Sequence, residues 1–350
     1  MNISQRANAI LGPVVFFALV IAGLFYVKWF PYYGKAFVAA AHHSLGQSIL
    51  MGGAASPPAF SWNAALGYAL AYGNAIWKAM VLGLLLGSAV QALLPADWVA
   101  RVLGRTGFGT TVAGGLLAIP GMICTCCAAP VVVGLRQRHA SPGAATAFWL
   151  GNSILNPATL VFIGFVLGWN WAALRLGLGI VMVFGLGYLV DRITGISDHE
   201  GTDPQLAELA ARREGLAAFA RWITILARMT IRLVPEYIVL VLFLGATRAW
   251  LFPHIGPEIG NTLWWIAIFA LAGTLFVIPT AGEVPIVQAM LSLGIGAGPA
   301  GALLMTLPPI SLPSLAMIAP SFRARVLIVV TVGVIAVGVL GGLLAVGLKL

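Results

Sequence analysis

Long apolar stretches separated by short polar ones run along almost the whole chain. Seven of them are about as long as the roughly 20 residues that a helix needs to cross the hydrocarbon core of a bilayer. They lie near residues 8–28, 72–94, 143–168, 171–190, 232–252, 298–319 and 324–347. The stretches are continuous and do not alternate apolar with polar positions, so they favour helices over the strands of a membrane β-barrel. The pattern predicts an all-α polytopic membrane protein.

Two further apolar regions, residues 106–138 and 262–294, are interrupted by proline and glycine. Proline cannot continue the hydrogen-bond ladder of a helix and disfavours a helical residue before it. We therefore expect the first region to break at Pro120 and to resume with Pro130 in the first turn of the next helix. Pro279 and Pro285 are expected to break the second region in the same way.

One strongly polar stretch, residues 191–216, holds six of the ten acidic residues and reads as a soluble connector. Arginine and apolar residues then follow at helical spacing over 214–231, a pattern typical of a helix that lies along the membrane surface. The predicted organisation has four parts: residues 1–70, the N-terminal span and a connecting segment; 71–190, a first transmembrane repeat; 191–231, the cytoplasmic connector with its surface helix; and 232–350, a second transmembrane repeat.

The two halves on either side of the connector resemble one another. Val81–Pro95 aligns without gaps on Val239–Pro253, with seven of the fifteen positions identical. The stretch from Ile119-Pro120 to Pro130 corresponds to Ile278-Pro279 up to Pro285, and Ser153–Pro157 corresponds to Pro309–Pro313. Such internal repeats are common in transporters, whose sites lie between the halves.

The positions of the basic residues predict how the halves are oriented. If each broken region enters and leaves on one side as a re-entrant hairpin, the halves have opposite orientations. With the connector and the N-terminus in the cytoplasm, most arginines then fall inside, as the positive-inside rule requires. These are Arg6, Arg101, Arg105, Arg136, Arg138, Arg192, Arg212, Arg213, Arg221, Arg323 and Arg325, whereas Lys28, Lys35, Arg175, Arg248 and Lys349 fall outside. The prediction is therefore inverted repeats, each with a re-entrant broken helical hairpin.

Composition agrees with a membrane protein and excludes several other classes. Hydrophobic residues make up 60% of the 350 residues and charged residues only 8%, against about a quarter charged in soluble domains. The net charge of +9 comes from residues at the ends of apolar runs, and no nucleic-acid-binding motif accompanies it. No phosphate-binding loop, catalytic triad or histidine ligand motif is present, so we expect neither an enzyme nor a bound cofactor.

The three cysteines of the chain, Cys124, Cys126 and Cys127, stand together between two prolines. Non-helical backbone at membrane depth is tolerated only where it lines a protein or water-filled cavity, and a helix N-terminus favours thiolate. Thiolates select soft ions, so the cluster is a candidate three-sulfur site for a thiophilic metal or metalloid. Three small buried apolar residues are the plain alternative. A disulfide is disfavoured by the odd count and by the strain of bridging adjacent residues.

The sequence around this cluster resembles a known family. The run Pro120–Pro130, the following Gly134–Ala147 and Asn152-Ser-Ile-Leu-Asn-Pro157 are similar to the ArsP-like predicted permeases. That family includes efflux proteins for trivalent arsenicals and related metalloids, and the resemblance implies the same transporter class here. Family members usually carry a Cys-Ser-Cys-Gly type motif where this chain has Cys-Thr-Cys-Cys, so the third sulfur departs from the common pattern.

Other polar groups are expected beside the thiols. Glu283 lies in the second-half segment that corresponds to the cysteines, and a charge at membrane depth costs at least about 2.5 kcal/mol. We interpret it as a proton-coupling or ion-pairing group, or alternatively as an interfacial carboxylate at a hairpin end. Asn152 and Asn156 precede a proline within a span, where they either line the path or bond to freed backbone groups.

The sequence thus predicts a permease of a bacterial inner or plasma membrane that exports a thiophilic metal or metalloid, of the arsenic or antimony type, or an organic derivative. Two alternatives stay open: a membrane thiol-redox or sulfur-handling protein, and a small-anion transporter with incidental cysteines. The expected partners are the substrate and the lipid bilayer, with a homo-oligomer left open and nucleic acid excluded.

Overall fold

The computed structural model describes residues 3–51, 57–194, 218–252 and 256–350, and within these ranges every regular element is a helix. The elements are α1 (Ile3–Leu24), η1 (Phe25–Trp29), α2 (Phe30–His42), α3 (Trp62–Leu93), α4 (Ala96–Leu103), α5 (Phe108–Ala118), η2 (Ile119–Gly121), α6 (Thr125–Gln137), α7 (Pro142–Ile154), α8 (Pro157–Val166), α9 (Trp169–Ile180), η3 (Val181–Gly185), α10 (Leu186–Thr194), α12 (Ala218–Leu251), α13 (Leu263–Leu275), α14 (Glu283–Ser292), α15 (Ala297–Thr306), α16 (Leu312–Ile318), η4 (Ala319–Ser321) and α17 (Ala324–Gly347).

Six of the described helices are long and apolar enough to cross a membrane. They are Gly12–His42, Trp62–Leu93, Pro142–Val166, Trp169–Thr194, Phe219–Leu251 and Ala324–Gly347. A seventh span results if the pair Ala96–Leu103 and Phe108–Gly121, bent by 113° at its break, is counted as one. The prediction of an all-α polytopic membrane protein is confirmed.

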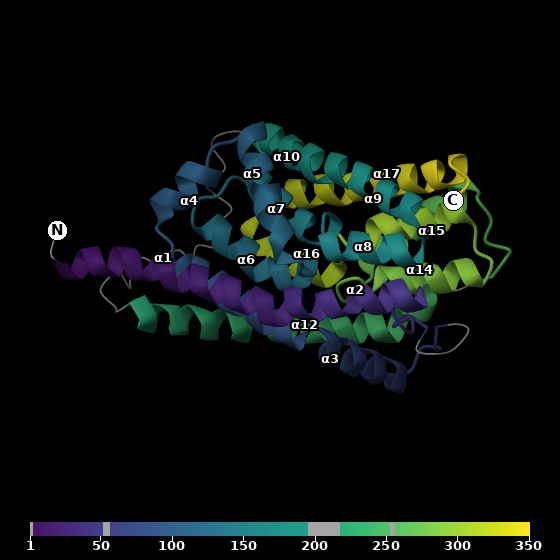
Figure 1. Cartoon of the computed structure of the whole chain (residues 1–350), viewed down its shortest axis with the longest axis horizontal. Coiled ribbons are helices and arrows are strands. Elements are labelled where there is room, and N and C mark those ends of the chain that lie inside the picture. Colours follow the sequence, from purple (N-terminus) through teal and green to yellow (C-terminus); the bar gives the residue numbers. More distant parts are fainter. Residues whose placement is uncertain (1–2, 52–56, 195–217, 253–255) are drawn as a thin grey trace.

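The helices form three layers in Figure 1. The long helices α1, α3 and α12 run along one edge, and α9, α10 and α17 run along the opposite edge. The shorter helices α6, α8, α14 and α16 fill the space between them. The second helix of each broken region, α6 or α14, therefore lies between the layers of long helices.

Two predicted spans differ from the structure. The expected span at 298–319 is two helices, α15 and α16, because Pro308 and Pro309 interrupt it. The first span does not end near residue 28 but continues through the π-helical turn η1 to His42. The polar residue that suggested an end, Lys28, is buried and finds hydrogen-bond partners inside the protein.

The predicted surface helix at 214–231 is also corrected. Residues 218–231 are the first part of the continuous helix α12, and Pro235 lies in the interior of that helix. Met229, Leu233 and Tyr237, at helical spacing, are buried, because α12 packs along α3. Most of the predicted connector, residues 195–217, lies outside the described residues.

The start of that predicted connector belongs to the helical bundle. Asp191 lies in α10 and is buried. Its carboxylate accepts hydrogen bonds from the backbone N–H groups of Gly107 at 2.9 Å and Gly143 at 2.7 Å. The carboxylate therefore joins the N-terminal ends of α5 and α7 to α10, and the polarity of Asp191 serves packing within the first half.

Both proline-interrupted regions consist of two short helices. The first holds α5 and α6, of 11 and 13 residues, and the second holds α13 and α14, of 13 and 10 residues. At about 1.5 Å per residue, each helix spans roughly half of a bilayer core of about 30 Å. Pro120 lies in η2 and Pro279 in the turn before α14, so both stand at the breaks.

The other two prolines lie within helices. Pro285 is in the first turn of α14, where a missing N–H costs little. Pro130 lies inside α6, which begins at Thr125, and this differs from the prediction that Pro130 opens the helix. The break therefore ends at Cys124, and Cys126 and Cys127 are helical.

Glycines on α3 allow α6 to approach it closely. A Cβ atom at Gly83 would lie 2.1 Å from the carbonyl oxygen of Cys127, and one at Gly87 would lie 2.3 Å from that of Pro130. Gly134 of α6 faces the carbonyl of Gly87 in return. This is the small-residue packing typical of membrane helix pairs, and it fixes the position of the cysteine-bearing helix.

We predict that Gly83→Ala lowers the thermal stability of the detergent-solubilised protein, because the added methyl group would overlap backbone that cannot move away. Overpacking of this kind costs about 1–3 kcal/mol. Gly73→Ala on the same helix is the matched control, since its Cβ would meet nothing within 4 Å. Equal unfolding midpoints for the two variants would refute the close approach of α3 and α6.

Candidate functional site

The three cysteines lie where the chain leaves the first break and starts α6. Met122 takes a left-handed conformation with φ of 49°, and Cys124 is extended and caps α6. Cys126 and Cys127 follow in the first turn. The unpaired N–H groups and partial positive charge of a helix N-terminus favour negative charge at this position.

The cluster divides into a pair of thiols and a single one. The sulfur atoms of Cys124 and Cys127 lie 2.9 Å apart, because the side chain of an N-cap residue faces the residue three positions later. Cys126 points elsewhere, with its sulfur 3.5 Å from the Ser311 hydroxyl and 4.0 Å from that of Tyr72. All three thiols are free and buried.

This geometry bears on how a soft ion could be held. In the part of the chain that the structure describes, no group of three or more His, Cys, Asp and Glu side chains is arranged to hold a metal ion. The structure brings two of the predicted sulfur ligands together and directs the third toward α16. The pair Cys124 and Cys127 is therefore the candidate capture site.

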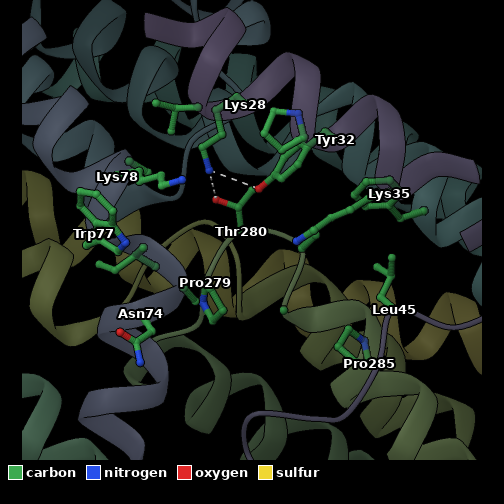
Figure 2. Close-up of a pocket in the computed structure, with 18 of the residues that line it drawn as sticks. Lys28, Tyr32, Lys35, Leu45, Asn74, Trp77, Lys78, Pro279, Thr280 and Pro285 are labelled. Carbon is green, nitrogen blue, oxygen red and sulfur yellow. Dashed lines mark hydrogen bonds between the residues drawn. The ribbon is translucent and has the colours of Figure 1, made fainter. Parts of the chain in front are cut away.

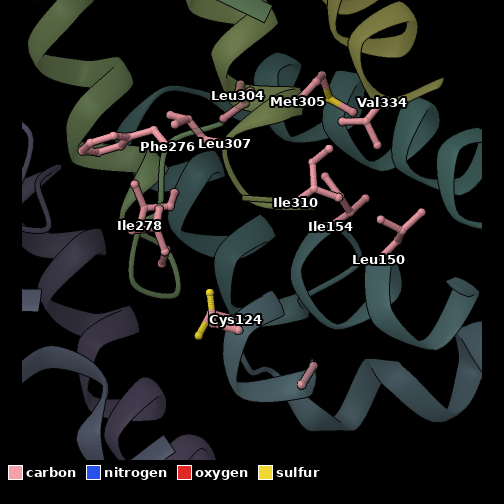
Figure 3. Packing of buried hydrophobic residues seen from close by; sticks show 14 of the residues in the cluster. Cys124, Leu150, Ile154, Phe276, Ile278, Leu304, Met305, Leu307, Ile310 and Val334 are labelled. Carbon is pink, nitrogen blue, oxygen red and sulfur yellow. The ribbon is translucent and has the colours of Figure 1, made fainter. Parts of the chain in front are cut away.

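The thiol pair faces the break of the second half. Cys124 lines a small cavity together with Ser153, Glu283, Pro308 and the segment 278–281. Figure 3 shows Cys124 opposite the loop that carries Ile278, with apolar side chains of both halves packed around them. Glu283, which was predicted to lie near the cysteines, thus lines the same cavity as Cys124.

Among the described residues, Glu283 forms an ion pair with Arg175. Its Oε1 atom lies 2.6 Å from Nη1 of Arg175, and both side chains are almost fully buried. Its Oε2 atom is buried and has no hydrogen-bond partner among the described residues. Glu283 is therefore held inside the bundle by a cation from the first half and is not an interfacial carboxylate.

The two asparagines occupy different places. Asn156 caps α8, since its Oδ1 atom accepts hydrogen bonds from the N–H groups of Ala158 and Thr159. Asn152 lies against the first break, where a Cβ at Gly121 would be 2.1 Å from its Oδ1 atom. That oxygen is buried without a hydrogen-bond partner in the described structure. Asn156 thus bonds to freed backbone groups, and Asn152 stays a candidate for the path.

Side-chain donors bond to carbonyl groups at three of the helix breaks. Trp29 donates to the Pro120 carbonyl at 2.8 Å, and Tyr68 donates to that of Val277. Arg175 donates to the Ser153 and Ile154 carbonyls, where α7 ends, at 2.7 and 3.3 Å. Because lipid offers no hydrogen bonds, these donors are what make broken helices tolerable at this depth.

Sequence reasoning missed two residues beside the site, Lys28 and Arg175. It placed both at the outer ends of predicted spans, yet both are buried inside the bundle. The available signal was their position. Lys28 is the last residue of the predicted span 8–28, and Arg175 lies inside the predicted span 171–190, so both could have been recognised as charges within spans.

These features define a multi-pass membrane protein whose broken helices meet around buried polar groups in its centre. The family model ArsP_1, described as a predicted permease, matches residues 75–346. The chain belongs to this family of predicted permeases.

Two curated relatives agree with this assignment. The chain is 50% identical over 333 residues to the UPF0718 protein YraQ of Escherichia coli (strain K12), covering 95% of this chain and 94% of that protein. It is 24% identical over 305 residues to the UPF0718 protein MJ0584 of Methanocaldococcus jannaschii, covering 67% of this chain and 82% of that protein. No solved structure matches the chain.

We predict that Glu283→Gln and Arg175→Met each destabilise the protein strongly. Removing one partner of a buried ion pair leaves the other charge uncompensated, which typically costs about 3–5 kcal/mol. The double variant should recover the part of the loss that comes from the unpaired charge, but not the part that comes from the Ser153 and Ile154 carbonyls, which still lack their donor. A double-mutant cycle on the thermal unfolding midpoint checks this, and additive effects of the two substitutions would contradict it.

Proposed function

We propose that this permease exports a thiophilic metal or metalloid species, of the trivalent arsenic or antimony type, or an organic derivative of one. The observation that carries the proposal is the position of the thiol pair. Cys124 and Cys127 stand at the N-terminus of a broken helix with their sulfur atoms close together, and Cys124 lines a small cavity shared with the break of the other half. A pair of soft ligands at such a place is suited to binding a soft cargo.

The proposed transport cycle needs two halves that can move against each other, and the helix packing supports inverted repeats. The helices α3 and α12, which hold the corresponding stretches Val81–Pro95 and Val239–Pro253, pack against each other in opposite directions. Trp222 at the start of α12 donates to Ser88 near the end of α3. Gly245 near the end of α12 contacts Tyr68 near the start of α3.

Other helix pairs that join the two halves also support inverted repeats. The helix α17 of the second half runs opposite to α9 and α10, because Gly333 faces Leu186 and Gly341 faces Leu178. Across the centre, α6 packs on α16 while α14 packs on α8. If α6 corresponds to α14 and α8 to α16, exchanging the halves maps one contact onto the other, which supports a pseudo-two-fold relation.

In the proposed mechanism the thiols of Cys124 and Cys127 bind the cargo, and rocking of one half against the other exposes the cavity to the opposite side. Glu283 lies at the same cavity and is tied to Arg175 of the other half. We propose that protonation of Glu283 weakens this connection between the halves and couples movement to a proton gradient. The unpartnered Oε2 atom is the place where a proton can bind.

We predict that the double substitution C124S/C127S abolishes the metalloid resistance that the protein confers on a sensitive bacterial host. Serine oxygen is a poor ligand for a soft ion. Cys126→Ser, at a neighbouring buried position, should retain most of the resistance because that sulfur faces Ser311 and Tyr72.

Resistance is measured as growth over a series of trivalent arsenical and antimonial concentrations, with membrane expression of each variant quantified in parallel. Wild-type resistance in a normally expressed C124S/C127S variant would refute capture by the thiol pair. Loss of resistance in Cys126→Ser alone would place the capture site at α16 instead.

The arrangement also favours a second candidate function, thiol redox chemistry. Cys124 and Cys127 have the Cys-x-x-Cys spacing at a helix N-terminus that is typical of reactive dithiols, and their sulfur atoms are close. Redox-dependent alkylation of this pair in membranes, with no protection by arsenicals, would favour this function over transport of a soft ion.

A further inference from the structure

A second, larger cavity lies on the other side of the Pro279–Ala281 segment from the thiols. Its volume is about 530 Å³, and it is bounded by the first span, by α3 and by the loop before α14. Pro279, Thr280 and Ala281 line both this cavity and the small one beside Cys124. The two cavities are therefore neighbours that share one wall.

Three of the four lysines in the chain line this larger cavity: Lys28, Lys35 and Lys78. In Figure 2 their side chains extend from two different helices toward one another and toward Thr280. Lys28 and Lys35 stand two helical turns apart on the first span, and Lys78 lies in the middle of α3. None of the described residues that line the cavity is acidic.

Lys28 is the deepest of the three. It is only 5% exposed, and its ammonium donates to the Tyr32 hydroxyl at 3.2 Å and to the Thr280 hydroxyl at 3.0 Å. Both hydrogen-bond partners are neutral, and the thiols of Cys124 and Cys127 are near enough to interact with the charge of Lys28. A buried cation in a membrane span is costly, and such residues are usually functional.

We propose that this lysine-lined cavity binds a small anion through an oxyanion group, either the carboxylate of an organic molecule or an inorganic oxyanion. Three ammonium groups without a carboxylate create a strongly positive cavity, and the Thr280 hydroxyl and Gln47 add neutral hydrogen-bonding groups. The volume and the apolar walls formed by Trp77, Phe162 and Leu45 match those of organic-ligand pockets. We therefore favour an organic anion over an inorganic oxyanion as the ligand.

The site is distinct from the one proposed for metalloid export. Lys28 and Lys35 precede residue 75, where the family match begins, and the cysteines do not line this cavity. The groups proposed to contact the anion are lysines, Thr280 and Gln47, and none of them is a thiol. The proposal extends the substrate range of the protein to anions that enter beside the thiol pair.

The test uses full-length protein in nanodiscs of phosphatidylcholine, whose headgroups carry no net charge and do not compete. Equilibrium binding of radiolabelled citrate and radiolabelled sulfate is measured at low and high ionic strength. Lys28→Gln should weaken binding of the probe about tenfold, the loss expected for one charge-assisted hydrogen bond. High salt should weaken the binding of wild-type protein as well.

Further variants keep the test decisive if Lys28→Gln folds poorly. The exposed pair K35Q/K78Q should weaken binding by tenfold or more, whereas Lys349→Gln, an exposed lysine away from the cavity, should bind as wild type. Tighter binding of citrate than of sulfate identifies an organic anion as the ligand, and the reverse identifies an inorganic one. Absence of binding for both probes, or equal binding by K35Q/K78Q and Lys349→Gln, would overturn the proposal.

The C124S/C127S variant separates this inference from the proposed function. It removes the thiols that act on the charge of Lys28, so it should bind the anion at least as tightly as wild type while losing metalloid resistance. If resistance persists and anion binding is retained, the thiol mechanism fails and the lysine site stands. If resistance is lost but the lysine variants bind both probes normally, the anion site fails and the thiol mechanism stands.

Discussion

The fold depends on supplying hydrogen bonds to backbone that is broken inside an apolar bundle. A helix that stops at membrane depth leaves carbonyl and N–H groups that lipid cannot satisfy. Here the carbonyls receive donors from distant side chains: Trp29 to Pro120, Tyr68 to Val277 and Arg175 to Ser153. The N–H groups receive caps, as with Asn156 at α8 and Ser311 at α16. Trp29, Tyr68 and Arg175 each lie on a helix that does not contain the carbonyl they bond, so these three bonds also hold the helices together.

The same constraint explains why the chemistry gathers in the centre. The breaks create helix N-termini, and the first carries the thiols while the second carries Glu283. Arg175 serves two purposes at once, because it bonds the carbonyls at the end of α7 and pairs with Glu283 of the other half. Close packing of α3 on α6 through Gly83 and Gly87 then fixes the thiol-bearing helix in place. The site is thus a consequence of how the broken backbone is stabilised.

The sequence was sufficient for the class of fold and for part of the site. Apolar run length identified the spans because the bilayer sets a minimum length, and the prolines identified both breaks. The length of an apolar run predicted the wrong helix end where a polar residue has hydrogen-bond partners in the folded protein. Lys28 suggested the end of a span, but Tyr32 and Thr280 accept its hydrogen bonds, and the helix continues. The surface helix at 214–231 failed for a related reason, since its apolar face packs on α3.

The finer geometry of the site could not be read from spacing alone. Three cysteines within four residues suggested three equivalent ligands, but a helical turn places Cys124 and Cys127 on one face and turns Cys126 toward Ser311. That division required knowing that α6 begins at Thr125 and not at Pro130. The partner of Glu283 was equally hidden, because Arg175 lies more than a hundred residues away in the sequence. Long-range pairing of this kind leaves no local pattern.

The most direct measurement of the central claim is site-resolved protection of the cysteines from alkylation by a trivalent phenylarsenical. Membranes that contain the protein are treated with a thiol reagent with and without the arsenical, and modification at each cysteine is quantified by mass spectrometry. The account predicts protection at Cys124 and Cys127, with Cys126 changed much less. Absence of protection, or protection confined to Cys126, would contradict the assignment of Cys124 and Cys127 as the capture site.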